Sequence, residues 1–498
     1  YHKVTGVQTC ALPISDMKYV TEGLEPRRVL ELFEEISAIP RGSGNEEAVA
    51  KWIEKFASDR KCFCLRDGSN NVFVRVPATA GREHEAAVML QGHMDMVCEK
   101  KEGVAHDFLR DGISIRVEDG WLRADGTTLG GDDGAAVAMM LAVIDGQLAT
   151  HPTVECLFTT DEEVGLLGAG SFDYSNVTAK SMINLDSEAE DSVTVGCAGG
   201  VRSDMTVPVK TQEMRGEALE ISITGLCGGH SGENINCGRT NAIKLMGRLL
   251  IAVGKKMRVN LVTVRGGGKD NAIPREAFAV ISVADADRAA RAVLRETERV
   301  RAELRAEDAG LTVGCSVAAD APDKMMTAET TRRVLAVMGT VQNGVIEMSR
   351  DVEGLVGFSR NLGIVKTDES GVTFVFSSRS PVESQLDAST DSLDALAAVI
   401  GAKTVHYSRY PGWNYAQRSP LRNKYLKAAA RVLGYEPKVT VIHAGLECGI
   451  IRSHLPKLDM ISIGPDMKGI HTPDEALSAA SCERIWKIVG EMLRSEER

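Results

Sequence analysis

Three adjacent carboxylates, Asp161, Glu162 and Glu163, follow an apolar run in the stretch FTTDEEVGL (158–166). Like charges at this spacing repel one another, so the cluster needs either solvent or a cation to be tolerated. A solvated acidic turn is one interpretation, and a metal site is the other. Adjacent side chains of an extended chain point apart, so Glu162 and Glu163 could take different roles, one binding metal and one moving protons.

Two further stretches offer polar side chains next to apolar segments. In GHMDM, His93 and Asp95 are two residues apart and share a face of an extended chain, so Asp95 is placed to orient the imidazole. In TTLGGDDG, Asp132 and Asp133 follow two glycines and precede an apolar stretch. These aspartates could cap the helix that follows, or the glycine backbone could aim one carboxylate into a cleft.

Asp186 and His471 complete the set of polar residues that follow apolar segments. Asp186 ends the apolar stretch INLD, where a lone aspartate could equally be a cap. His471 precedes TPDE, a combination typical of a helix start, with Thr472 as the N-cap and Glu475 at the third position. We therefore expect His471 to be fixed just ahead of a helix.

The five motifs together predict a site for two divalent cations. Two histidines and three carboxylates can act as ligands, and one glutamate is left over. Two divalent cations are balanced in charge by three carboxylates and a bridging hydroxide. Nitrogen and oxygen ligands without thiolates favour zinc, with manganese or cobalt as alternatives.

The segments that would position these residues alternate between strands and helices. Apolar residues recur at helical spacing over residues 25–38, and residues 133–144 have the composition of a buried helix. Short β-rich runs lie at 71–76, 86–91, 153–160 and 181–186. This alternation predicts an α/β domain with a mixed, largely parallel sheet sandwiched by helices. Ligands usually bind at the ends of such strands.

A second domain is expected after residue 196, where the pattern changes. The predicted strands there are 218–226, 277–283 and 372–378, and the predicted helices are 230–253, 286–306, 326–340 and 387–400. From about residue 410 the first pattern returns, with a strand at 458–464. We therefore predict a discontinuous domain, residues 17–196 and 409–498, and an inserted α+β domain, residues 197–408.

Composition limits the classes of function. The chain has 58 basic and 69 acidic residues, a net charge of −11, and no block of Lys and Arg, which argues against nucleic acid or an anionic membrane as a partner. No apolar run approaches the roughly 18–20 residues that span a bilayer. The eleven cysteines lack paired spacing, which favours reduced thiols and a cytoplasmic location. Residues 1–16 precede Met17 and are interpreted as a non-native extension.

The ordered motifs GHMDM, TTLGGDDG, TTDEEVG, NLDSE and GIHTPDE resemble those of the two-metal aminoacylase/carboxypeptidase-type metallopeptidases. Within them, the chain is most similar to the aminoacyl-histidine dipeptidase branch, also called cytosolic nonspecific dipeptidase. The stretches IPRGSGNEEAVAKWI, GGHSGENI and KDNAIPRE add to the resemblance, which extends from Met17 to the C-terminus.

The resemblance implies a role for each metal ligand. His93 and Asp186 would bind one zinc ion, Glu163 and His471 the other, and Asp132 would bridge the two. In this family the peptide bond after the bridging aspartate is typically cis, which here is the bond to Asp133.

The resemblance also implies catalytic and substrate-binding residues. Glu162 would be the general base for a metal-bridging hydroxide, and Asp95 would steady His93. The inserted domain would be a lid, in which His230 polarises the scissile carbonyl while Asn271 and Arg379 hold the substrate carboxylate.

The function implied is the metal-dependent hydrolysis of dipeptides, both Xaa-His and broader Xaa-Xaa substrates. An aminoacylase or amidase that acts on N-acyl amino acids is the alternative within the same chemistry. A non-catalytic peptide- or metal-binding protein would be expected to have lost a ligand or the general base, and all of these residues are present. The family often dimerises through the lid, so a homodimer is a further expectation.

Overall fold

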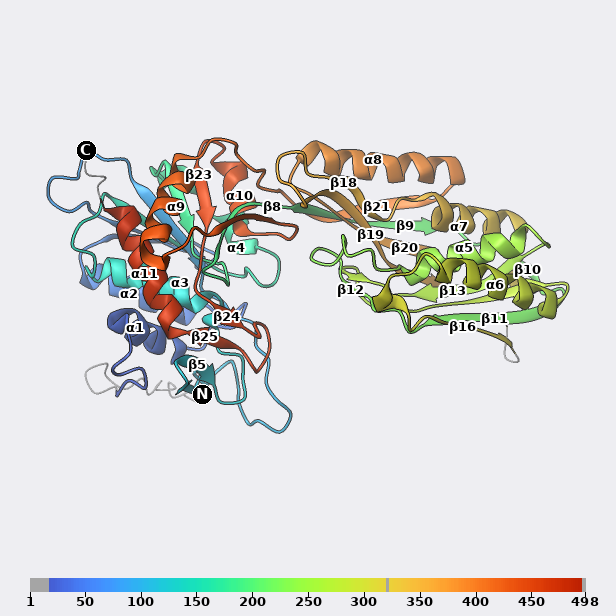
Figure 1. The fold of residues 1–498 in the computed structure, drawn as a ribbon, viewed down its shortest axis with the longest axis horizontal. Coiled ribbons are helices and arrows are strands. Elements are labelled where there is room, and N and C mark those ends of the chain that lie inside the picture. The colour runs from blue at the N-terminus through green and yellow to red at the C-terminus, as the bar shows by residue number, and fades with distance from the viewer. Residues whose placement is uncertain (1–17, 319–321, 495–498) are drawn as a thin grey trace, which may run out of the picture. The chain divides into compact units, whose positions relative to one another are not determined.

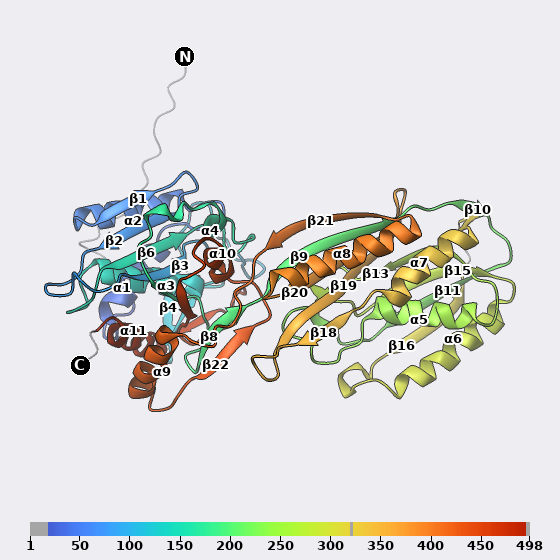
Figure 2. The ribbon, with the colours of Figure 1, turned by 90° about the horizontal axis from the view of Figure 1, so that it is seen from above.

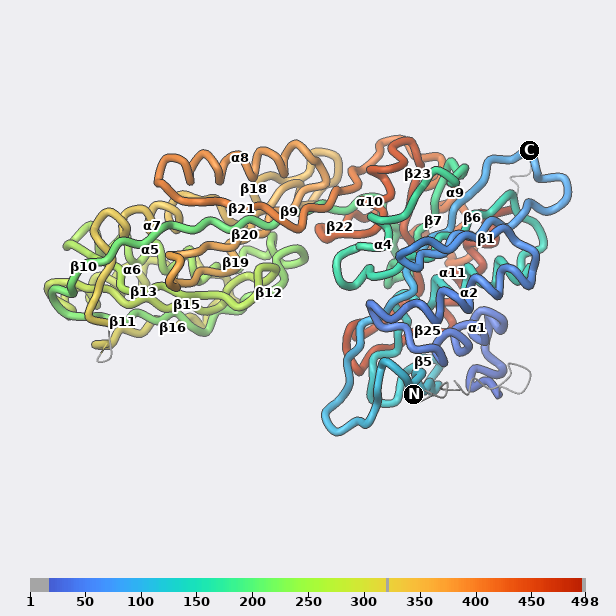
Figure 3. The backbone as a smooth tube through the Cα atoms, turned by 180° about the vertical axis from the view of Figure 1, so that it is seen from behind, coloured from blue at the N-terminus to red at the C-terminus, as the bar shows by residue number. Residues whose placement is uncertain are grey.

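The computed structural model describes residues 18–318 and 322–494, and the predicted N-terminal extension lies outside them. The chain divides into two compact units. The first consists of the described residues up to Val195 together with Ala416–Thr440 and those from Ile450 onward, and the second consists of Gly196–Tyr415 and Val441–Gly449. In Figure 3 the first unit contains the blue to teal N-terminal segments and the orange to red C-terminal segments, and the second unit runs mainly from green through yellow to orange.

An eight-stranded sheet organises the first unit, in the order β1-β2-β6-β3-β7-β23-β8-β22. Its central strands β6, β3, β7 and β23 run parallel to one another, whereas β2 pairs antiparallel with β6, β1 antiparallel with β2, and β8 antiparallel with β23. β6 is buried at every position, as expected for an apolar strand covered on both faces. The bounds are β1 (Phe63–Arg66), β2 (Val72–Val76), β3 (Val88–His93), β6 (Val154–Thr159), β7 (Ser181–Asn184), β8 (Ser192–Cys197), β22 (Lys438–Ile442) and β23 (Asp459–Ser462).

Helices pack around this sheet (Figure 1). Among them, α3 is apolar on all sides and packs against both α1 and β3, which explains why its sequence shows no polar face. A four-stranded sheet, β24-β25-β5-β4, lies in the same unit. The bounds are α1 (Arg27–Ser37), α2 (Glu47–Asp59), α3 (Gly131–Ile144), α4 (Leu167–Ser171), α9 (Pro420–Leu433), α10 (Glu447–His454), α11 (Ala479–Leu493), β4 (Ile115–Glu118), β5 (Trp121–Ala124), β24 (Met467–Lys468) and β25 (Ala476–Ser478).

The second unit is built on a larger sheet, in the order β16-β11-β15-β13-β19-β20-β9-β21, with β18 paired to β19. Four helices, α5 to α8, lie on one face of this sheet (Figure 2). The helices are α5 (Ala242–Gly254), α6 (Ala286–Arg301), α7 (Ala328–Thr340) and α8 (Glu383–Ile400). The strands are β9 (Gly199–Val207), β11 (Glu217–Thr224), β13 (Asn260–Gly266), β15 (Ala277–Val283), β16 (Thr312–Val317), β18 (Gly344–Met348), β19 (Val356–Asp368), β20 (Gly371–Ser380) and β21 (Lys403–Tyr410).

The structure confirms the predicted fold class: one unit is α/β with a mixed, largely parallel sheet, and the other is α+β. Within the described ranges, every helix is too short or too polar to cross a bilayer.

Two local predictions are wrong. The helix expected over 230–253 begins only at Ala242, because the Asn241 side chain accepts the N–H groups of Ile243 and Lys244 and so caps it there. The helix expected after His471 does not form: the chain makes a turn, continues as β25, and α11 begins at Ala479.

Candidate functional site

Polar side chains gather where the parallel strands of the first unit end. β3 ends at His93, β6 is followed by Glu162 and Glu163, and β7 is followed by Asp186. Because parallel strands present their carboxyl ends at one edge of the sheet, side chains distant in sequence meet there. His93 is fully enclosed, with only 1% of its surface exposed.

Asp132 lies between the two histidines. One of its carboxylate oxygens, Oδ1, is 3.1 Å from His93 Nε2, and the other, Oδ2, is 3.0 Å from His471 Nε2. His471 Nε2 is also 3.0 Å from Glu163 Oε1, and His93 Nε2 is 3.5 Å from Asp186 Oδ1. The two oxygens of the Asp132 carboxylate thus face two different groups of side chains, one around His93 and the other around His471.

Three groups of side chains in the described residues are compact enough to hold a metal ion, and each offers ligand atoms within 4.8 Å of one another. The groups are His93, Asp132 and Asp186; Asp132, Glu163 and His471; and His93, Glu162 and Glu163. All the donors are imidazole nitrogens or carboxylate oxygens, a combination that fits zinc, manganese or cobalt. The residues present therefore fit the predicted pair of divalent cations.

The electrostatics show how strongly these groups interact. Hydrogen bonds to Asp132 and Glu163 raise the pKa of His471 to about 11. Burial raises the pKa of Asp186 to about 7, although His93 opposes the shift. Burial also acts to raise the pKa of Asp132, but hydrogen bonds from His471 and His93 outweigh it and hold that pKa below its usual range. Carboxylates so close together require positive charge nearby.

Asp95 connects the ends of β3 and β6. It is completely buried, and its Oδ1 lies 3.2 Å from His93 Nδ1. Oδ1 also accepts the N–H of Glu162 at 3.1 Å, while Oδ2 accepts the N–H of Glu163 at 3.2 Å and the hydroxyl of Ser43 at 2.8 Å. One carboxylate thus orients an imidazole and fixes the backbone of both glutamates.

Asp161, the third acid of the cluster, has a different environment. Its φ is +51°, and its backbone N–H donates to Glu46 Oε1 at 3.0 Å. Its carboxylate belongs to none of the three candidate metal groups in the described part of the chain.

The segment α3 begins after Gly130, whose φ is +70°, but Asp132 and Asp133 have non-helical backbone angles and the regular helix follows them. Asp133 is buried, and its Oδ2 accepts the backbone N–H of His93 at 3.2 Å. The Asp132–Asp133 peptide bond is cis, as predicted.

The three predicted substrate contacts all lie in the second unit. His230 is in β12 (Gly229–His230), which pairs with β14 (Ala272–Ile273) directly after Asn271. Arg379 is in β20, and its Nη1 donates to the Tyr410 hydroxyl at 3.0 Å. Burial and the nearby Arg379 charge lower the pKa of His230.

The sequence did not reveal two residues that organise this site. Glu475 was interpreted as part of a local helix cap, but its carboxylate binds the backbone at the start of α3. Arg41 is buried, and its guanidinium donates to the carbonyls of Met94 and Gly130. Arg41 lies in the stretch IPRGSGNEE, where an arginine among small residues was the only available signal.

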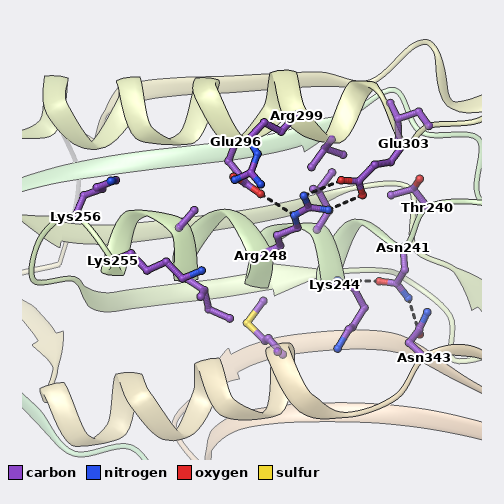
Figure 4. A pocket seen from close by; sticks show the side chains of 17 residues that line it. Thr240, Asn241, Lys244, Arg248, Lys255, Lys256, Glu296, Arg299, Glu303 and Asn343 are labelled. Carbon is purple, nitrogen blue, oxygen red and sulfur yellow. Dashed lines mark hydrogen bonds and ion pairs between the residues drawn. The ribbon is translucent and has the colours of Figure 1, made fainter.

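A groove of about 870 Å³ lies on the second unit between α5, α6 and α7 (Figure 4). Arg248 donates to Glu296 through Nε at 2.8 Å and to Glu303 through both terminal nitrogens. Lys244 Nζ donates to the carbonyl of Val341 at 2.7 Å. The central charges of the groove therefore serve to hold α5 against its neighbours.

Comparison with known proteins identifies the class. The sequence profile of peptidase family M20/M25/M40 matches residues 89–495, and the chain belongs to this family. It is 35% identical over 476 residues to the cytosol non-specific dipeptidase of Escherichia coli, a match that covers 95% of this chain and 98% of the relative. Family membership confirms the predicted class of metal-dependent peptidase.

The structural comparison agrees. Aminoacylhistidine dipeptidase from Vibrio alginolyticus superposes with a TM-score of 0.90 and 34% identity, covering 96% of this chain and 98% of that one. Aminopeptidase PepT from Bacillus cereus superposes with a TM-score of 0.55 and 16% identity, which shows a shared fold.

Proposed function

We propose that this protein hydrolyses dipeptides, both Xaa-His and broader Xaa-Xaa substrates, with two divalent cations held around Asp132. The observation that carries the proposal is that the two oxygens of Asp132 face His93 and His471 separately. In this assignment His93 and Asp186 hold one cation, Glu163 and His471 hold the other, and Asp132 is common to both. Both dipeptidase relatives cover nearly the whole chain.

Zinc is the metal that we assign, with manganese and cobalt as alternatives, because the donors are nitrogen and oxygen. The bound cations would polarise the scissile carbonyl and make the attacking water more acidic. Glu162 acts as the general base that takes the proton of this water and returns it to the leaving amine. Asp95 supports this role because it holds the backbone N–H of Glu162 and lies beside His93.

The second unit supplies the substrate contacts in this proposal. Nδ1 of His230 accepts the backbone N–H of Glu233 at 3.3 Å, so the proton of the neutral imidazole lies on Nε2 and can be donated to a carbonyl oxygen. The guanidinium of Arg379, whose Nη1 donates to the Tyr410 hydroxyl, has the planar fork that suits a carboxylate, and we assign it this role together with Asn271. The second unit is thus assigned as the lid.

Two further assignments concern location and assembly, the first drawn from a relative and the second from the family resemblance. The name of the Escherichia coli relative places that protein in the cytosol, and we propose a cytoplasmic location here. We also propose a homodimer formed through the second unit.

Replacing Glu162 with glutamine tests the mechanism. Loss of the general base is expected to lower kcat at least about 10²-fold while leaving the metal content unchanged. Asp161→Asn is the matched control, because Asp161 lies in the same loop and asparagine tolerates its positive φ. Turnover by the Glu162→Gln variant at a rate close to wild type would show that the role is misassigned.

A substrate panel tests the specificity. After loading with zinc, manganese or cobalt, the protein is expected to hydrolyse Xaa-His and Xaa-Xaa dipeptides faster than N-acetyl amino acids. Faster hydrolysis of the N-acetyl amino acids would identify an aminoacylase instead.

A further inference from the structure

Glu475 binds a loop that is far away in the sequence. Only 3% of the surface of this residue is exposed. Oε2 accepts the N–H groups of Leu129 at 2.7 Å and Gly130 at 3.0 Å, and Oε1 accepts those of Gly131 at 2.8 Å and Asp132 at 3.3 Å. Asp132 and Asp133 have non-helical backbone angles, so residues 129–132 form a loop that leads into the regular turns of α3. Glu475 therefore holds the backbone of the loop that carries Asp132 from another segment of the chain.

Arg41 holds the same loop from its carbonyl side. Nη2 donates to the carbonyl of Gly130 at 2.5 Å, while Nη1 donates to those of Met94 at 2.8 Å and Asp95 at 3.2 Å. A Cβ on Gly130 would lie 2.5 Å from Arg41 Nη2, and one on Gly134 would lie 2.6 Å from it. Two glycines of the GGDDG stretch, Gly130 and Gly134, thus leave the room that the Arg41 guanidinium occupies.

These contacts join the three segments that carry the central ligands. Arg41 ties the segment after His93 to the loop before Asp132, and Glu475 ties that loop to the segment of His471, four residues upstream. The carboxylate of Asp132 must reach both histidines at once, at 3.1 and 3.0 Å, so a small rotation of its backbone would break one contact.

We propose that Glu475 is a positioning residue for the metal pair, and that Arg41 completes the clamp. Glu475 fixes the position of the Asp132 backbone relative to the segment of His471, so both ligands are already aligned when the cations bind. Outer partners that orient metal ligands commonly change metal affinity about 10–100-fold. This inference rests on the proposed function, because it requires that Asp132 and His471 bind metal.

The substitution Glu475→Gln tests the inference, because it keeps the size of the side chain but presents an NH₂ group to backbone N–H donors. Zinc affinity is measured by competition with a chromogenic chelator, and the ligand geometry by the visible absorption of the cobalt-loaded protein. We expect the Kd for zinc to rise at least about 10-fold and the cobalt bands to shift.

Two matched controls separate positioning from folding. Asp474→Asn removes an adjacent, exposed carboxylate that pairs with Lys101 at 2.6 Å. Asp308→Asn replaces a buried carboxylate of the second unit, which accepts the N–H groups of Cys227 and Thr240, with an amide that can accept through only one oxygen. Both controls are expected to keep the Kd for zinc within about twofold of wild type, although Asp308→Asn should lower the unfolding midpoint.

Each outcome decides the matter. If Glu475→Gln lowers the unfolding midpoint but binds zinc as tightly as wild type, Glu475 only stabilises the loop and the inference is wrong. If that variant does not fold, Arg41→Lys is measured instead, because lysine keeps the charge but not the two terminal nitrogens that bind the carbonyls. Arg41→Lys must then show the same weakened zinc binding, and a wild-type zinc affinity in this variant would show that the inference is wrong. A wild-type protein that binds no divalent cation overturns the proposed function as well.

Discussion

Replacing Asp95 with asparagine converts one oxygen of a buried carboxylate into an NH₂ group without changing its size. The amide can be oriented in two ways. With the NH₂ group in place of Oδ1, it opposes the N–H of Glu162 and Nδ1 of His93. With the NH₂ group in place of Oδ2, the Ser43 hydroxyl can rotate to accept a hydrogen bond, and only the N–H of Glu163 loses its acceptor. The second orientation costs less.

The magnitude follows from that single unpaired group. A buried N–H that loses its partner costs about 1–3 kcal/mol, so the free energy of unfolding of the first unit should fall by this amount. The freed N–H belongs to Glu163, so its carboxylate is held less firmly, and the Kd for zinc should rise about 10–100-fold.

Tryptophan fluorescence in urea measures the first effect. Three of the four tryptophans, Trp52, Trp121 and Trp486, lie in the first unit, so the signal reports mainly on that unit. Ser43→Ala is the control, because it removes a hydroxyl that donates to the same carboxylate, at a cost of about 1.5–3 kcal/mol, but leaves the acceptors of both glutamate N–H groups and so should keep the zinc affinity of wild type. Wild-type stability together with wild-type zinc affinity in Asp95→Asn would refute the role given to Asp95.

Two further substitutions test the packing of each unit. Gly130→Ala places a Cβ 2.5 Å from Arg41 Nη2 at a φ of +70°, whereas the control Gly434→Ala has a similar φ of +80° and open space around its Cβ. Gly130→Ala should therefore lower the free energy of unfolding by about 1–3 kcal/mol more than the control does. Equal losses in the two variants would contradict the packing of Arg41 on Gly130. Burial lowers the pKa of Lys244 from 10.5 to about 8, so the unfolded chain binds the extra proton in that range and stability should rise as the pH increases from about 8 to 10.5. Lys244→Met should remove this rise in denaturation measured against pH, and an unchanged pH dependence would show that Lys244 is not its source.

The local pattern was sufficient to predict the strands that carry the ligands. β3, β6 and β7 are short apolar runs followed by polar residues, and such runs are buried in parallel sheets. The order of the motifs then indicated which polar residues belong together. β19 was not predicted, because its first eight residues are buried on both faces, including Arg360 and Asn361, so it lacks the polar alternation of a surface strand.

The error at HTPDE shows what a local pattern cannot reveal. Thr472 and Glu475 have the spacing of a capping box, but the Thr472 hydroxyl donates to the carbonyl of Gly469 and accepts the N–H of Asp474 within a turn. Glu475 accepts N–H groups more than 340 residues away in the sequence, as its bond to Gly131 shows. No short-range rule identifies such a partner, and the same holds for Arg41.

Anomalous diffraction at the zinc edge, from crystals of the zinc-loaded protein, tests the central claim most directly. Two peaks are expected, one beside His93 and Asp186 and the other beside Glu163 and His471, with the carboxylate of Asp132 between them. A single peak, or two peaks that do not share Asp132, would contradict the proposed metal pair.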